Sequence, residues 1–195
     1  MQTNLAPIMR DMLIRFQQSA IRETGRRPMT YLRTPMDEAL VLPGCQRPGY
    51  AFWQPVAWPD DQPPLGPKAK LFHESIIAYL SMCQFLEIRF FLPVAHLNSP
   101  LSFLYRRAFE TYRNTELSPP SRAFEEAVLY QREHPALPLA FCMAATCDDA
   151  EPLLLCLRAS DGQAFVLHAA AEADPFYLNL AVDRLLPKLQ FVYDL

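Results

Sequence analysis

The first 25 residues carry one apolar stripe at helical spacing. Apolar side chains recur there every three or four positions, at Leu5, Ile8, Met9, Met12, Leu13, Phe16 and Ala20. This spacing predicts an amphipathic helix over about 4–24, and Gly25 is suited to end it. The arginines on its polar side are compatible with a helix that lies on a membrane surface. A stripe of this kind more commonly packs on its own domain.

The segment 26–67 is punctuated by proline and reads as extended. Two short apolar runs, residues 39–42 and 50–56, predict two strands, with Pro-Gly turns at 43–44 and 48–49 between them. Proline recurs so densely over 59–67 that regular structure is excluded, and we predict a flexible loop there.

The middle of the chain reads mainly as helices. Residues 68–83 place Leu71, Phe72, Ser75, Ile76, Tyr79 and Leu80 along one stripe. Ser99-Pro100 opens a second predicted helix, with a stripe at Leu101, Leu104, Tyr105, Ala108 and Tyr112. A third is predicted from Pro119-Pro120-Ser121 toward His134. Residues 85–92 fit either a strand or a continued helix; as a strand, one face would hold Leu86, Ile88, Phe90 and Leu92.

The last third predicts strands joined by tight connections. Apolar runs at 139–146, 152–159 and 163–169 are strand candidates, and Asp161-Gly162 is a strong hairpin signal that requires a positive φ at Gly162. Asp174-Pro175 predicts the cap of a final helix that carries Leu178, Leu180, Ala181, Leu185 and Leu186. Strands in hairpins beside separate helices predict an α+β fold, with a mainly antiparallel central sheet flanked by helices, in a single domain over 1–195.

Composition agrees with one folded domain. The chain has 195 residues, 51% of them hydrophobic, which suffices for a substantial core. Its start lacks the charged-then-apolar pattern of an export signal, and no uninterrupted apolar run is long enough for a membrane span. Five cysteines are an odd number in a chain that needs no disulfides. We therefore expect a cytoplasmic protein with reduced thiols.

Charge is divided unevenly along the sequence. Residues 1–35 carry six arginines against two acidic residues, whereas the rest of the chain holds 12 basic and 19 acidic groups. Between 143 and 183 a single basic residue, Arg158, faces seven acidic ones. Such a block repels nucleic-acid phosphates, so nucleic acid is not an expected partner. It favours a protein partner with a basic surface.

Motifs for catalysis or metal binding are missing. Cys142 and Cys147 lie five apart, which is not the spacing of a zinc knuckle or a redox pair, and Ile77 stands where a zinc-protease helix begun at His73 would need its second ligand. No nucleophile elbow, Walker loop or dinucleotide fingerprint occurs, and only five glycines are present. We expect no catalytic residues, no metal and no cofactor, and therefore no enzyme.

The order of several short motifs is suggestive when they are taken together. Gly25-Arg26-Arg27-Pro28 follows the first helix, Pro43-Gly44-Cys45 precedes a strand with Phe52-Trp53-Gln54-Pro55, and Leu-Pro-Leu-Ala-Phe at 137–141 precedes the Asp161-Gly162 hairpin. In this the chain resembles the Syd family of the SUKH superfamily, bacterial proteins that interact with the SecY subunit of the protein translocon. The most specific match is residues 52–55. The chain departs over 85–115, where Arg106-Arg107 and long aromatics replace a polar, glycine-bearing segment.

The resemblance implies a protein-binding function. A Syd-like protein would associate peripherally with the cytoplasmic face of the inner membrane and contact basic translocon loops. Related SUKH proteins serve as immunity proteins that bind and neutralise toxin domains, which is the alternative function. The charge block supplies the expected partner-binding residues, all predicted in exposed turns or at helix starts: Asp148, Asp149, Glu151, Asp161, Glu172 and Asp174. Trp53 is interpreted as a buried residue of the core.

Overall fold

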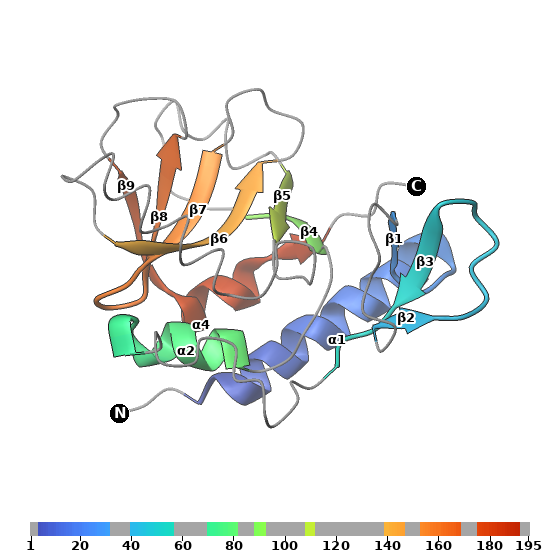
Figure 1. Ribbon diagram of the computed structural model, residues 1–195, viewed down its shortest axis with the longest axis horizontal. Coiled ribbons are helices and arrows are strands. Elements are labelled where there is room, and N and C mark those ends of the chain that lie inside the picture. The colour runs from blue at the N-terminus through green and yellow to red at the C-terminus, as the bar shows by residue number, and fades with distance from the viewer. Residues whose placement is uncertain are drawn as a thin grey trace.

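The computed structural model describes the chain over residues 4–31, 40–56, 70–81, 88–92, 108–111, 139–146, 153–168 and 175–191. These residues form helices on one side of a large antiparallel sheet and a second, smaller sheet near the end of the first helix (Figure 1). The predicted α+β class with a mainly antiparallel sheet is confirmed.

Helix α1, Leu5–Thr24, has the boundaries that the apolar spacing predicts. The side chain of Asn4 caps its start by accepting a hydrogen bond from the Ala6 amide at 3.1 Å. Gly25 ends it with φ at 68°, and its amide donates to the carbonyl of Ile21 at 2.8 Å. The predicted stripe is the buried face, with these fully buried members: Leu5, Met9, Met12, Phe16 and Ala20.

The small sheet packs beside α1. Its three antiparallel strands lie in the order β1-β3-β2 and are β1 (Met29–Tyr31), β2 (Val41–Leu42) and β3 (Tyr50–Trp53). The last two were predicted, whereas β1 is too short to show an alternating pattern. Trp53 is 1% exposed, as predicted, and its ring lies 5.4 Å from that of Phe16, centroid to centroid. The Phe-Trp-Gln-Pro segment therefore packs the small sheet against α1 through the contact between Trp53 and Phe16.

The large sheet has seven strands. Six of them follow one another as an antiparallel meander, and the seventh, β10, pairs with the first of these at one edge. Its order is β10-β4-β5-β6-β7-β8-β9, and every neighbouring pair is antiparallel. The strands are β4 (Ile88–Phe91), β5 (Ala108–Thr111), β6 (Ala140–Thr146), β7 (Leu153–Arg158), β8 (Gln163–His168), β9 (Phe176–Ala181) and β10 (Gln190–Phe191). Residues 88–91 thus resolve the earlier ambiguity in favour of a strand. On β4 and just beyond it, Ile88, Phe90 and Leu92 are all buried.

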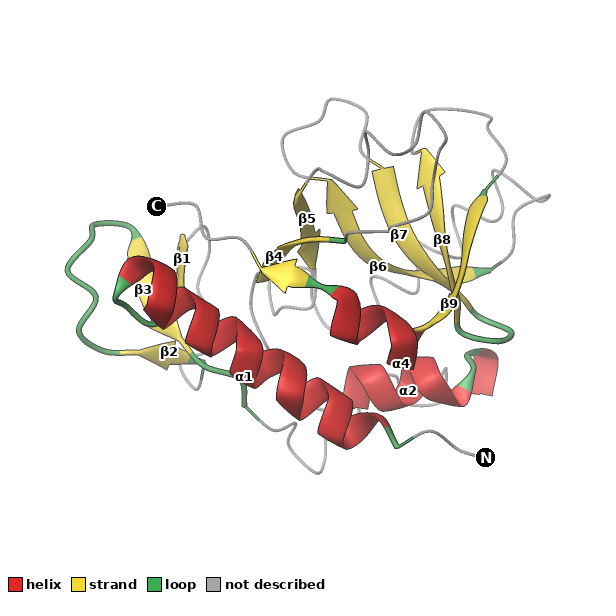
Figure 2. Ribbon diagram, turned by 180° about the vertical axis from the view of Figure 1, so that it is seen from behind, coloured by secondary structure: helices red, strands yellow, loops and turns green. Residues whose placement is uncertain are grey.

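The helices cover one face of this sheet. They are α1, α2 (Glu74–Ser81), α4 (Val182–Leu185) and the adjoining 3-10 turn η3 (Leu186–Lys188) (Figure 2). Leu155 and Leu157 of β7 face them as part of the main core. Cys156, between those leucines, packs with Phe165 and Leu167 in a second cluster. Strands β7 and β8 are therefore buried on both faces, and Cys156 is a thiol of the core.

Two predicted helices are wrong where the structure describes them. Residues 108–111, expected within a helix, form β5, because pairing with β4 and β6 on both sides satisfies their backbone groups. Residues 176–181, expected in the final helix, form β9. Their burial alternates, with Tyr177 and Asn179 exposed between half-buried neighbours. Only the last part of that helix exists, as α4 and η3.

The remaining predictions are shortened or fall outside the described residues. The helix predicted over 68–83 is observed as α2, Glu74–Ser81. The hairpin after β7 is present, with a four-residue connection over 159–162, and Gly162 has φ at 70° as predicted. The loop over 59–67, the helix toward His134 and the turn at 147–149 lie outside the described residues.

Candidate functional site

The predicted acidic surface is only partly described. Of its six residues, Asp161 lies within the described ranges, while Asp148, Asp149, Glu151, Glu172 and Asp174 lie outside them.

The described strand ends nevertheless constrain where the two acid-rich segments attach. Residues 147–152 leave from the end of β6 and return at the start of β7, where Ala145 pairs with Leu154. Residues 169–174 leave from the end of β8, where His168 pairs with Leu153, and return to β9 beside Val166. Both segments are thus attached at the same end of the large sheet. We call this end, marked by Thr146, Leu153, His168 and Phe176, the acidic-segment end.

Asp161 belongs to the opposite end of the sheet. It lies in the connection that joins the far ends of β7 and β8. Strand β7 has six residues, so about 20 Å of extended chain separates that connection from the acidic-segment end. Asp161 therefore lies at the opposite end of the sheet from the strand ends to which segments 147–152 and 169–174 are joined.

The charge of Asp161 is engaged within the hairpin itself. Its carboxylate accepts a hydrogen bond from Arg158 Nε at 2.9 Å, forms an ion pair with a second nitrogen of the same guanidinium, and accepts from the Gln163 amide at 3.1 Å. The hydrogen bond from Arg158 lowers the pKa of Asp161 and raises that of Arg158. The Arg158 guanidinium also lies 5.1 Å from the Tyr177 ring centroid. The carboxylate of Asp161 therefore stabilises the turn between β7 and β8.

This pairing predicts a pH-dependent effect of Asp161→Asn. Because the pKa of Asp161 is lower in the folded state, its ionised form contributes stability above the unfolded pKa, and that contribution is lost as pH falls through the folded pKa. The pair is partly exposed, so the difference should stay below about 1 kcal/mol. We expect the free energies of unfolding of parent and variant, measured in urea, to differ near neutral pH and to converge well below pH 3.8. A difference that grows on acidification would contradict the assignment.

The hairpin is fastened to the start of α2. The His73 amide donates to the carbonyl of Ala159 at 2.6 Å, and His73 Nδ1 lies 2.8 Å from Ser75 Oγ and 3.3 Å from the Ser75 amide. A serine hydroxyl beside an imidazole is also the pair that nucleophilic catalysis uses. Here the imidazole caps the first turn of the helix, and Gly162 packs against the hydroxyl. The contact between His73 and Ser75 therefore has a structural role at the start of α2.

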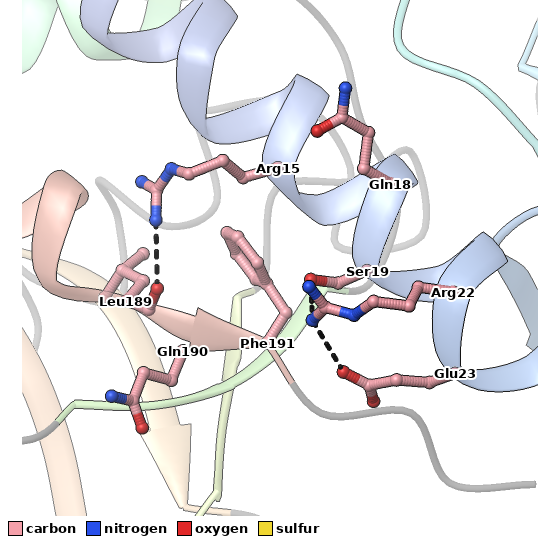
Figure 3. Close-up of a pocket in the computed structure, with 8 residues that line it drawn as sticks. All are labelled: Arg15, Gln18, Ser19, Arg22, Glu23, Leu189, Gln190 and Phe191. Carbon is pink, nitrogen blue, oxygen red and sulfur yellow. Dashed lines mark hydrogen bonds and ion pairs between the residues drawn. The ribbon is translucent and has the colours of Figure 1, made fainter.

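A groove of about 450 Å³ runs between α1 and β10 (Figure 3). Arg15 extends from α1 toward Leu189 and donates to the carbonyls of Leu186 at 3.1 Å and Leu189 at 3.3 Å. The same guanidinium lies 5.6 Å from the Phe191 ring centroid and pairs with Asp11 at 2.9 Å. Arg15 thus supplies donors to the carbonyls of the first residue of η3 and of Leu189 just after it, which holds the first helix against η3.

Most of the side chains that line the groove are polar. Arg22 donates to Ser19 Oγ and to a Glu23 carboxylate oxygen, each at 3.3 Å, while Gln18 and Gln190 complete the lining. The spacing of Arg15, Gln18 and Arg22 along one side of a helix is visible in the sequence. What the sequence does not show is β10, a two-residue strand that forms the opposite wall.

The described residues hold no arrangement for metal chemistry. Among them, no three histidine, cysteine, aspartate or glutamate side chains gather closely enough to hold a metal ion. Cys45 and Cys156 are not in disulfides, and Cys45 Sγ contacts Met29 Sδ at 3.8 Å. No helix in the described ranges combines the length and the apolar character needed to cross a lipid bilayer.

Comparison with known proteins does not place the chain in a family. No protein-family model matches the sequence, and no curated protein matches it.

Proposed function

We propose that the chain is a non-catalytic, Syd-like protein-binding domain that contacts basic loops of the SecY translocon subunit through the acidic-segment end of its large sheet. The observation that carries the proposal is the strand topology. Antiparallel pairing of β6, β7, β8 and β9 attaches the two acid-rich segments, 147–152 and 169–174, at one end of the sheet. Together they contain five acidic residues and no basic one.

Electrostatics explains why such an end suits a basic partner. Exposed ion pairs contribute about 0–1 kcal/mol each, so no single carboxylate is expected to dominate. Five like charges attached to one end of a sheet act through their summed potential, which accelerates and orients the approach of an opposite charge. Asp161 is left out of this surface, because it lies at the other end and is paired with Arg158.

The partner is inferred from the resemblance of residues 52–55 to Syd proteins. In the structure Trp53 is buried against Phe16, Phe52 is half-buried and Gln54 is exposed. The tryptophan therefore has a role within the fold, which leaves partner binding to another part of the surface. This supports assigning recognition to the charged sheet end rather than to the aromatic motif.

Charge reversal at this end tests the proposal. We expect Asp148→Lys/Asp149→Lys to lower the rate constant for association with detergent-solubilised SecY about tenfold at low salt, because the steering potential falls. Added salt should slow the parent in the same way, since it screens charge beyond roughly 10 Å at 0.1 M. Biosensor kinetics would measure both effects, and circular dichroism would verify that the variant is folded.

Asp11→Lys/Glu23→Lys is the matched control, because it changes the net charge equally but lies on α1. Its association rate should stay within about twofold of the parent's if steering is local. Equal slowing by both variants would reduce the effect to net charge and remove the sheet end as the site. Absence of any SecY binding, with recovery of a toxin domain from the native host at low salt, would replace the translocon by the immunity function.

A further inference from the structure

Helix α1 presents a second apolar line on its outer side. Ile14 and Ile21 are 44% and 52% exposed, although large aliphatic side chains on a surface helix normally face the core. At 100° per residue, they lie on one line, opposite the buried Met12 and Phe16. Their separation of seven residues is two helical turns, about 10 Å. Pro7, also exposed, continues the same line.

Arginines flank this line on both sides. By the same helical geometry, Arg10 lies to one side of the isoleucines and Arg22 to the other, and both are exposed. Arg26 and Arg27 are exposed just beyond the end of the helix. Within the described part of the chain, Arg10, Arg26 and Arg27 have no ion-pair partner. Residues 4–27 therefore carry five arginines against two acids, in a protein whose net charge is −3.

We propose that this outer face of α1, with Ile14 and Ile21 between Arg10, Arg22, Arg26 and Arg27, binds the surface of an anionic phospholipid membrane. Lying in the headgroup layer, the two isoleucines would enter the acyl boundary while the arginines meet lipid phosphates, the arrangement that holds interfacial helices. Each arginine near such a surface raises partitioning about fivefold. Two isoleucines are too few for the core of a stable protein interface, whereas apolar and ionic contributions to membrane partitioning add together.

The groove beside the same face adds polar groups at the level of the headgroups. Gln18 of α1 and Gln190 of β10 both line the groove, and both are exposed. The inference does not depend on the protein partner proposed above. The arrowheads of β6 and β8 point away from α1 in both views (Figures 1 and 2), so lipid and protein would occupy different surfaces.

Vesicle co-sedimentation of the full chain tests this surface. We expect binding to vesicles that contain phosphatidylglycerol and little binding to pure phosphatidylcholine, with loss at high salt. Ile14→Ser/Ile21→Ser should lower partitioning about tenfold, because the apolar contact is removed. Arg10→Gln/Arg22→Gln should lower it about twentyfold and weaken its salt dependence.

Leu71→Ser is the matched control, since Leu71 is 46% exposed but lies on the turn before α2. It should bind vesicles like the parent, and all variants should melt like the parent because the changed side chains are exposed. Equal binding to both lipids, or indifference to the isoleucine change, would overturn the proposal. So would binding of duplex DNA instead of vesicles, or a dimer in solution that the isoleucine change dissociates.

Discussion

Trp53→Ala is expected to destabilise the protein more than any other single change considered. Its side chain is 1% exposed and packs on Phe16, which in turn meets Phe191 with ring centroids 5.5 Å apart. Removing the indole leaves a cavity where the small sheet, α1 and β10 meet, at a cost of about 3–5 kcal/mol. For a chain of this length the melting temperature should fall by roughly 6–20 °C.

Trp53→Phe separates packing from the polar atom of the ring. The indole Nε1 is buried and has no hydrogen-bond partner among the described residues, so phenylalanine removes a buried donor while keeping an aromatic face. It should cost clearly less than alanine in urea denaturation. Normal stability of Trp53→Ala together with lost partner binding would contradict the packing role and move the residue to the interface.

Gly162→Val should be the second most damaging change, for two separate reasons. The residue has φ at 70°, which β-branched side chains disfavour, and a Cβ there would clash with Ser75 Oγ. Strain in the turn costs about 1–3 kcal/mol. Displacing the start of α2 adds about 1–3 kcal/mol, as overpacking of a filled site does. Urea denaturation should therefore show a loss well above that of a turn residue alone.

Gly25 provides a matched comparison that isolates the contact with Ser75. It has φ at 68°, yet a Cβ there would meet nothing within 4 Å. Gly25→Ala should cost only the backbone strain, and Gly162→Ala should cost more. In a Ser75→Ala background, the excess at Gly162 should shrink, because the hydroxyl is gone. Equal costs at the two glycines in the parent would show that the hairpin does not press on α2.

Much of the fold could be predicted because its local signals are strong. The α1 stripe with the glycine that ends it and the Asp161-Gly162 turn each specify backbone geometry within a few residues, whereas residues 85–92 fitted either a strand or a helix. Where the prediction from sequence was wrong, the structure is determined by pairing with strands that are distant along the chain. Ala108–Thr111 is a strand because β4 and β6 lie on either side of it. Residues 176–181 fit either periodicity until β8 pairs with them.

The candidate sites show the same limit. The acidic residues could be recognised in the sequence. Only the strand pairing shows that Asp161 lies at the opposite end of the large sheet from the strand ends that flank segments 147–152 and 169–174. The groove joins Arg15 and Arg22 to Leu189 and Phe191, which are remote in sequence. The outward isoleucines were present in the helical pattern from the start. Their exposure became informative only once the opposite stripe was found to fill the core.

The closure of the large sheet by β10 has a consequence for synthesis on the ribosome. Strand β4 gains its outer neighbour only when Gln190 and Phe191 have been made, and Arg15 finds its carbonyl acceptor at Leu189, 174 positions later. Residues up to Phe191 must therefore have left the exit tunnel before the docking of the first helix is complete. Until then the Met9 and Phe16 side of α1 lacks this cover, which makes that helix a natural binding site for a chaperone during translation.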